Sequence, residues 1–415
     1  MTAQTDNTPS PHPGLGFRQF VALIALMMAI NALSIDIMLP ALPAIGDDLG
    51  VTNHNQRQWV ITAYLLGFGV AQLFYGPLAD RYGRKPVLLT GLALYTAFTL
   101  VAAFAWSFET MMLARVLQGV GAAATRVLAI SIVRDCYSGR RMARVMSLTF
   151  IVFLAAPIVA PSLGQAIVLV APWPWIFGAL AVFSTFILFW AALRLPETLH
   201  PDNRVPLSPA GVIGAFRLAL TTRVAVGYML ASTAIVGCLF AFIASAQQVF
   251  ADALGRPDLL APLFALVACA MGVSSFLNAR IVERIGARRV SHAALLGFIA
   301  VAVIHAAVAA SGAETVLTFV VLQSAMMFCF GLVGSNFGAM AMEPLGHIAG
   351  TASSVQGFVS TIGAAVIGAA IGQQFDGTLV PLTLGFVAFG TLALLIVLWT
   401  ERGRLFRPVQ GSPQT

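Results

Sequence analysis

Long apolar runs recur along this chain from residue 17 to residue 400, and they limit the fold more than any other feature of the sequence. A membrane-spanning helix needs roughly 20 apolar residues, so twelve such helices take up about 250 residues. The chain has 415 residues, of which only 9% are charged, whereas soluble domains carry about 25%. The sequence therefore predicts an all-α, polytopic membrane protein with twelve transmembrane helices.

The apolar runs fall into two sets of six, separated by a long polar stretch. The predicted segments are 17–45, 57–78, 86–106, 109–133, 142–167 and 173–193, then 223–250, 259–280, 289–311, 314–340, 347–373 and 379–400. We expect a disordered tail at 1–16, an N-terminal six-helix bundle at 17–193, a linker at 194–222, a second bundle at 223–400 and a tail at 401–415.

Basic residues are distributed unevenly over the predicted loops. Of the 23 Lys and Arg residues, only Arg57 and Arg256 fall on the side opposite the termini, and Arg115 and Arg126 fall inside a predicted helix. The remainder share the side that holds both termini, and cytoplasmic loops carry the excess of basic residues. We therefore expect both termini in the cytoplasm. The net charge of +7 then reflects membrane topology, and no nucleic-acid partner is expected.

Motifs for catalysis, metals or cofactors are missing from the sequence. The four cysteines form no C-x-x-C pair, no H-E-x-x-H is present, and the only lysine, Lys85, lacks the G-K-[ST] context of a phosphate-binding loop. No G-x-S-x-G occurs, and no soluble domain longer than the linker at 194–222 interrupts the helices. These observations disfavour a membrane-embedded enzyme or sensor, and we expect neither a metal nor a cofactor.

An internal repeat relates the two halves. The loop Asp80-Arg81-Tyr82-Gly83-Arg84-Lys85 recurs as Glu283-Arg284-Ile285-Gly286-Ala287-Arg288, about half a chain later. An acid, an arginine, a glycine and a final base keep their spacing, which maps each half onto the other in the same orientation. Parallel duplication of a six-helix unit is typical of secondary transporters, in which the substrate binds between the halves.

Asp36 is the acidic residue that lies deepest in a predicted span. Ionisable groups inside a membrane are functional candidates by default because burying them is costly. A carboxyl group in a low-dielectric cavity can bind and release a proton near neutral pH, so Asp36 is the predicted proton-coupling residue. The alternative is a structural role, in which Asp36 caps a helix broken near Pro40 and Pro43.

The fourth predicted helix carries two arginines, Arg115 and Arg126, on one face. At 100° per residue they lie within about 20° of each other, with Gly119 and Ala122 between them. The pattern predicts a groove of small residues with a guanidinium at each end, with Arg115 paired to Asp36 and Arg126 either facing substrate or gating the cytoplasmic side. Close helix packing is the alternative explanation for the small residues, but it leaves the arginines unexplained.

The loop that follows the second predicted helix has to reverse direction within a few residues, and Gly83 supplies the necessary backbone freedom. Asp80 is placed to sit against a helix N-terminus of the other half and so to latch the cytoplasmic side closed. The alternative is that the loop's bases, including Arg81 and Arg84, serve only topology.

Four stretches resemble a known family. Gly76-Pro-Leu-Ala-Asp80-Arg81-Tyr-Gly83-Arg84-Lys85 resembles the loop signature of the major facilitator superfamily, and Arg115-Val-Leu-Gln118-Gly119 resembles its R-x-x-Q-G motif. The run 156–164, with Pro157, Pro161 and Gly164, resembles the motif of twelve-helix drug:proton antiporters, although alanines replace two of its glycines. The run 34–43 looks like the first helix of the Bcr/CflA (bicyclomycin/chloramphenicol resistance) subfamily.

This resemblance implies a major facilitator fold and a proton-coupled exporter of small amphipathic drugs that works by alternating access in the bacterial inner membrane. It implies that Asp36 and Arg115 couple protons. The resemblance also assigns the cytoplasmic gate to Gly76, Asp80, Arg81, Gly83 and Arg84. We expect a monomer. A proton- or sodium-coupled importer of a small organic anion is the alternative, since two arginines in one groove would favour an anion.

Substrate contacts are the least constrained part of the prediction. Helical position and residue type give as candidates Arg126, Gln118, Tyr64, Phe240 and Met327. Aromatic and methionine side chains suit loosely specific binding, but ordinary packing against lipid or core is the alternative for each of them.

Overall fold

The computed structural model describes residues 15–204 and 209–406. Regular structure in these ranges is entirely helical, and twelve segments there are long and apolar enough to cross a membrane. The predicted all-α, twelve-helix organisation is therefore confirmed. Most of the predicted tail at 1–16 and residues 407–415 of the tail predicted at 401–415 lie outside the described residues.

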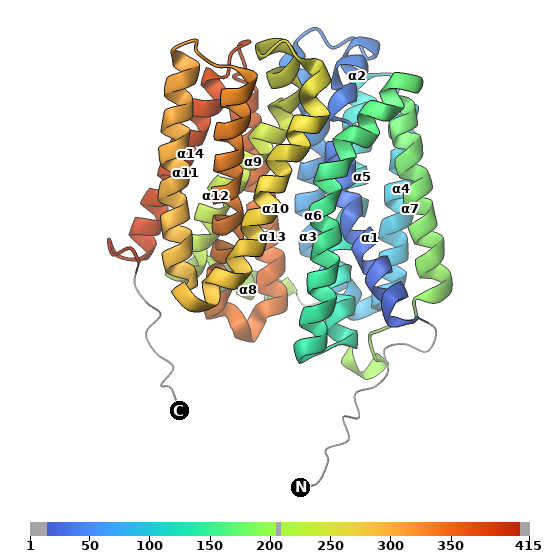
Figure 1. Cartoon of the computed structure of the whole chain (residues 1–415). Helices are drawn as coiled ribbons and strands as arrows, with labels where there is room; N and C mark the ends of the chain where they lie inside the picture. Colours follow the sequence, from blue (N-terminus) through green and yellow to red (C-terminus); the bar gives the residue numbers. More distant parts are fainter. Residues whose placement is uncertain (1–14, 205–208, 407–415) are drawn as a thin grey trace.

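The helices alternate in direction through two bundles that stand side by side (Figure 1). The N-terminal half contains α1 (Phe17–Asp36), η1 (Leu39–Ala41), α2 (Leu42–Asp48), η2 (His54–Gln58), α3 (Trp59–Tyr82), α4 (Arg84–Ala103), α5 (Phe108–Cys136), α6 (Gly139–Val170) and α7 (Pro174–Arg194). Then come η3 (Pro201–Asn203) and α8 (Pro209–Thr221). The C-terminal half contains α9 (Arg223–Gln248), η4 (Val249–Ala253), η5 (Pro257–Leu259), α10 (Leu260–Ile285), α11 (Ala287–Ala310), α12 (Val316–Met342), η6 (Glu343–Ile348), α13 (Ala349–Gly372) and α14 (Val380–Thr400).

Packing follows the internal repeat. In the N-terminal half α5 packs on α3 and α4, and α1 packs on α6; in the C-terminal half α12 packs on α10 and α11, and α9 packs on α13. The halves meet mainly through α3 against α13 and α6 against α10. Helix α1 begins and α14 ends at the same end of the molecule (Figure 1). We call the opposite end the outer end.

The first predicted span is interrupted where its prolines lie. Helix α1 ends at Asp36, and the chain continues through η1 and α2, which carry Pro40 and Pro43 in their first turns. A proline has no amide hydrogen and cannot continue a preceding helix without losing a hydrogen bond. Asp36 is thus the last residue of α1, at a break in the helix.

The predicted linker at 194–222 is more ordered than its composition indicated. Residues 209–221 form α8, and the Phe216 ring lies 6.1 Å from that of Phe358 on α13. Ile213, Phe216, Leu218 and Leu220 supply apolar side chains to this helix within a stretch that is polar on average.

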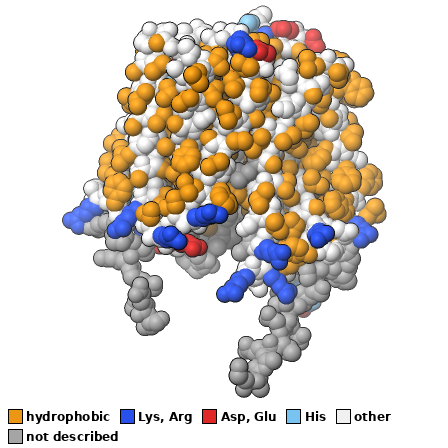
Figure 2. Space-filling model, in the orientation of Figure 1, with side chains coloured by type: hydrophobic (Ala, Val, Ile, Leu, Met, Phe, Trp, Pro, Cys, Tyr) orange, Lys and Arg blue, Asp and Glu red, His pale blue; other side chains and the backbone are white. Residues whose placement is uncertain are grey.

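The surface separates charge from apolar side chains. Hydrophobic side chains cover the middle of the molecule, while Lys and Arg gather at the end where α1 begins and α14 ends (Figure 2). The same view shows a notch between the two halves at that end. The distribution agrees with a chain that sits in a bilayer with its basic end on one side.

Candidate functional site

Arg115 is at the centre of a buried polar network in the N-terminal half. Its side chain is 0% exposed. Nε donates to the carbonyl of Val60 at 2.9 Å, Nη1 to Gln118 Oε1 at 2.5 Å and Nη2 to the carbonyl of Ser34 at 3.0 Å. The guanidinium also lies 4.6 Å from the Tyr64 ring centroid. One side chain on α5 therefore ties α3 and α1 together.

Asp36 lies close to this network but is not bonded to it. Its side chain is 3% exposed, and Oδ1 is buried with no hydrogen-bond partner. The predicted Asp36–Arg115 ion pair is not formed, because Arg115 donates to the carbonyl of Ser34, two residues earlier in α1. Burying a carboxylate without a partner is costly. A carboxyl group placed in this way is a proton acceptor that no ion pair holds in its charged form.

Arg126 occupies a different environment from Arg115. Its side chain is exposed halfway along α5, although Ala124 and Thr125 beside it are buried, and its guanidinium carbon is 6.0 Å from the Phe68 ring centroid. No ion-pair partner for Arg126 exists in the described part of the chain.

The predicted groove of small residues between Arg115 and Arg126 is not open, because α3 fills it. A Cβ on Gly119 would lie 2.1 Å from the carbonyl oxygen of Tyr64 and 2.8 Å from the amide nitrogen of Phe68. Ala122 is 0% exposed. The small residues thus serve close helix packing, the alternative that the sequence left open.

The stretch with the two prolines packs α6 tightly against α1. Helix α6 runs through Pro157 and Pro161 as one helix, and Pro161 is buried. Farther along, a Cβ on Gly164 would stand 1.9 Å from the carbonyl oxygen of Ile37, the residue that follows Asp36. The glycine of the antiporter-like stretch therefore lets α6 touch the backbone directly beside the buried acid.

Replacing Gly164 with alanine is expected to lower stability by about 1–3 kcal/mol, because the added methyl group meets backbone atoms that cannot rotate away. Gly178→Ala on α7 is the matched control, since the nearest atom to its Cβ, Trp175 Cε3, is 3.8 Å away. Thermal unfolding of the purified proteins in detergent measures the difference. Equal melting temperatures for Gly164→Ala and Gly178→Ala would show that α1 and α6 do not pack this closely.

The loop between α3 and α4 is held by hydrogen bonds and ion pairs to other residues of the N-terminal half. Gly83 has φ +101°, as its predicted turn requires. Arg84 is 3% exposed and binds Asp80 at 2.5 Å and Asp135 at 2.9 Å. The Glu197 carboxylate accepts from the backbone amides of Arg84 and Lys85. Asp80 Oδ1 accepts from Arg84 in its own loop, and its predicted contact with a helix N-terminus of the other half stays a prediction.

The C-terminal half repeats this arrangement with different residues. Arg288 binds Glu401 at 2.9 Å and Glu343 at 3.8 Å, and Tyr228 donates to Glu401 at 2.6 Å. Burial alone would raise the pKa of Glu401. The hydrogen bonds from Tyr228 and Arg288 outweigh burial and hold this pKa below its ordinary value. In each half, an acid that follows the last membrane-spanning helix therefore binds the start of the third one: Glu197 after α7 binds the start of α4, and Glu401 after α14 binds the start of α11.

At the outer end, uncharged amides join the two halves. Gln58 on η2 donates to Gln248 and to the carbonyl of Gly372, the latter at 3.0 Å. Gln248 donates to Asn55 Oδ1 at 2.7 Å, and Gln373 donates to the Asn55 carbonyl at 2.7 Å. The sequence analysis did not identify these residues, because amides at helix ends carry no distinguishing pattern.

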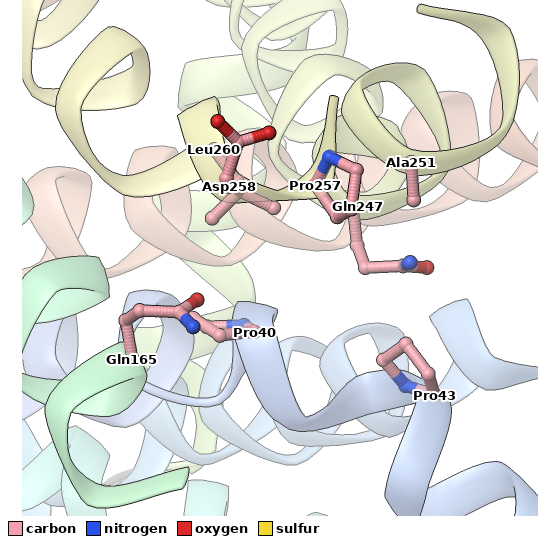
Figure 3. Close-up of a pocket in the computed structure, with 8 residues that line it drawn as sticks. All are labelled: Pro40, Pro43, Gln165, Gln247, Ala251, Pro257, Asp258 and Leu260. Atoms are coloured by element: carbon pink, nitrogen blue, oxygen red, sulfur yellow. The ribbon is translucent and has the colours of Figure 1, made fainter. Parts of the chain in front are cut away.

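A cavity of about 320 Å³ opens between the halves beside this amide cluster. Figure 3 shows side chains of η1, α2 and α6 on one side and those of α9, η4, η5 and α10 on the other. Its lining residues are Pro40, Pro43, Gln165, Gln247, Ala251, Pro257, Asp258 and Leu260. None of the five predicted substrate contacts lines this cavity.

Most of the predicted substrate contacts are packed in the interior. Gln118 and Tyr64 are 0% exposed and belong to the network around Arg115, and Met327 is 1% exposed. Phe240 is half-buried and packs against Gly368. Arg126 alone among the five is exposed. The structure also reveals Asn31, which accepts from Tyr64 and donates to Thr125 beside Arg126.

Two duplicated six-helix bundles, a buried unpaired acid and charged loops at one end define a membrane transporter of the secondary type. Residues 24–368 match the Major Facilitator Superfamily, and the chain belongs to that family. The human organic anion transporter MFSD10 (TETRAN) has a crystal structure that aligns with a TM-score of 0.65 at 18% identity. The alignment covers 92% of this chain and 99% of that one, so the two share the fold.

Bacterial relatives match over nearly their whole length. The uncharacterized MFS-type transporter YdgK of Bacillus subtilis is 31% identical, with 90% of this chain and 92% of the relative aligned. A bicyclomycin resistance protein homolog of Haemophilus influenzae is 29% identical (91% and 94% aligned). The multidrug resistance protein MdtL of Escherichia coli O9:H4 is 28% identical (93% and 96% aligned).

Proposed function

We propose that this protein is a proton-coupled exporter of small amphipathic drugs in the bacterial inner membrane, of the Bcr/CflA type, with both termini in the cytoplasm. Asp36 carries the proposal. It is an acid at a break in the first helix, 3% exposed, with Oδ1 unpartnered. Two relatives are a bicyclomycin resistance protein homolog and a multidrug resistance protein, which supports a drug as substrate.

Proton exchange at Asp36 follows from its neighbours. Arg115 is held by two carbonyls and Gln118, so its charge lies near Asp36 without neutralising it. A protonated Asp36 leaves this region with the single positive charge of Arg115. Loss of the proton creates an opposite charge nearby, which favours movement of α1 toward Arg115. Binding and release of one proton at Asp36 are in this way coupled to the position of α1 relative to α5.

Alternating access supplies the conformational step. The amides of Asn55, Gln58 and Gln248 close the outer end, while Asp80 is bonded within its own half. In the conformation that is open at the outer end, the hydrogen bonds between these amide side chains would be broken. The cytoplasmic loops of the two halves would then contact each other. The two six-helix bundles, residues 17–193 and 223–400, are the moving units in this proposal, and a monomer suffices for the cycle.

Proton release on drug addition tests the proposal. Chloramphenicol- and bicyclomycin-type compounds, added to the purified protein in weakly buffered detergent solution, should displace protons from it. Everted membrane vesicles should also accumulate the same compounds when respiration acidifies their interior, and an uncoupler should abolish this. The absence of both effects for every compound tested would overturn the exporter proposal.

Arg126 favours a second candidate, the import of a small organic anion. Its exposed guanidinium has no ion-pair partner in residues 15–204 and 209–406, and such a group recognises carboxylates well. The direction of transport separates the candidates: in intact cells a proton gradient lowers the accumulation of an exported drug and raises that of an imported anion.

A further inference from the structure

The C-terminal half contains a buried acid–base pair that the proposed transport cycle does not use. His305 on α11 is 0% exposed, and its Nε2 lies 3.4 Å from Oε1 of Glu314, in the loop between α11 and α12. The Glu314 side chain is 10% exposed. Both residues lie at the outer end of the C-terminal half, far along the chain from Asp36.

The polar atoms of this pair have few other partners. Both ring nitrogens of His305 and Oε2 of Glu314 are buried without a hydrogen bond, and Oε1 accepts one from Thr318 at 3.2 Å. The Phe319 ring lies 5.6 Å from that of His305, and Phe250 packs edge-on against Phe319 at 5.5 Å. The pair therefore lies in an apolar pocket, where each unsatisfied polar atom costs about 1–3 kcal/mol.

No other charge neutralises the pair. The elements packed against α11 at this end are α10, α12 and α14. Of the acids and bases there, Asp258 is engaged by Arg256 at 2.8 Å, and Asp376 accepts from Thr378 at 2.7 Å. Asp252 on η4 is exposed. Within residues 15–204 and 209–406, His305 and Glu314 have only each other as ion-pair partners.

Counting protons shows which state of the pair is favourable. With no proton, the pocket holds a carboxylate beside a neutral ring and carries an uncompensated negative charge. With two protons, it holds an imidazolium beside a neutral acid and carries an uncompensated positive charge. One proton, carried by either His305 or Glu314, leaves the pair with no net charge, and buried charge without compensation is the costly condition.

We propose that His305 and Glu314 form a second proton-binding site, which holds one shared proton and exchanges it with the solution at the outer end through Glu314. This goes beyond the proposed exporter function, because the site lies in the other half and does not depend on Asp36 or on any drug. Burial also raises the pKa of Glu314, which agrees with a proton retained there.

Stability as a function of pH tests this site. The folded pair holds its proton more tightly than the unfolded chain, in which histidine titrates near about 6.5. That stabilisation is complete between about pH 4.3 and pH 6.5, where the unfolded chain also carries one proton on these two groups, and it is lost as the pH rises through the point at which the folded pair deprotonates. The melting temperature of the full-length protein in detergent should fall by about 2 °C per pH unit there.

Glu314→Gln should flatten this decline, because the neutral amide leaves no shared proton to lose. Asp376→Asn, an exposed acid at the same end, should keep the wild-type slope. His305→Gln leaves Glu314 as a lone buried acid, so the decline should shift to lower pH, and this variant serves if Glu314→Gln does not fold. A wild type whose melting temperature stays constant from pH 6 to pH 10, a decline that persists in Glu314→Gln, or an unshifted decline in His305→Gln would overturn the proposal.

Discussion

Asp36→Asn is expected to abolish proton release on drug addition while leaving the protein folded. Asparagine has nearly the volume of aspartate, but its amide cannot take up and release a proton near neutral pH. Asp36 has no ion-pair partner among the described residues, so its replacement breaks no contact. The free energy of unfolding should therefore change by less than about 1 kcal/mol, and the release of protons should fall to the level of the buffer alone.

The matched control for this experiment is Asp376→Asn. Asp376 lies at the outer end as well, but its side chain is exposed and accepts a hydrogen bond from Thr378 in its own loop. It should release protons on drug addition as the wild type does. If Asp36→Asn still released them, the coupling residue would lie elsewhere. A drug that bound Asp36→Asn without releasing protons would locate coupling, rather than binding, at this carboxyl group.

Arg115→Leu is expected to cost about 3–5 kcal/mol of stability, the second large effect. The arginine donates to the carbonyls of Ser34 and Val60 and to Gln118, and it is 0% exposed. Leucine removes all three hydrogen bonds, and replacing a buried, hydrogen-bonded charged side chain is among the most costly substitutions. Thermal unfolding in detergent and the yield of monodisperse protein measure the effect.

Arg115→Lys should recover only part of the loss, because one ammonium group cannot reach three acceptors that are arranged for a guanidinium. Arg126→Leu is the control on the same helix. Arg126 has no ion-pair partner in the part of the chain that the structure describes, so its replacement should cost less than about 1 kcal/mol of stability. Equal losses for Arg115→Leu and Arg126→Leu would contradict the difference in burial between the two sites.

The two arginines show where sequence reasoning stops. Their spacing on α5 predicted one shared face, yet Arg115 is bonded to α1 and α3 whereas Arg126 is exposed. The difference depends on where α3 crosses α5, at Gly119. A helical wheel gives angles around one helix and contains no information on the neighbour that covers each face.

Asp36 was identified from sequence because an acid within an apolar run is rare and costly. Its predicted partner was wrong, since a hydrogen bond is decided by shifts of an ångström that hydropathy does not register. The amides that join the halves, Asn55, Gln58 and Gln248, had no signal at all. Such residues are ordinary at helix ends, and only the docking of two bundles brings them together.

The sequence by itself determined the class of protein, the twelve spans, the duplication and the concentration of basic residues at one end. The spans follow from the transfer cost of individual residues between water and lipid, the basic end follows from the distribution of charge over the loops, and the duplication follows from a repeated loop motif, all of which can be counted along the chain. The tertiary structure alone decided that Asp36 is unpaired, that Arg115 and Arg126 have different surroundings, and that His305 meets Glu314. Those outcomes depend on contacts between helices, where close packing selects one partner for each side chain.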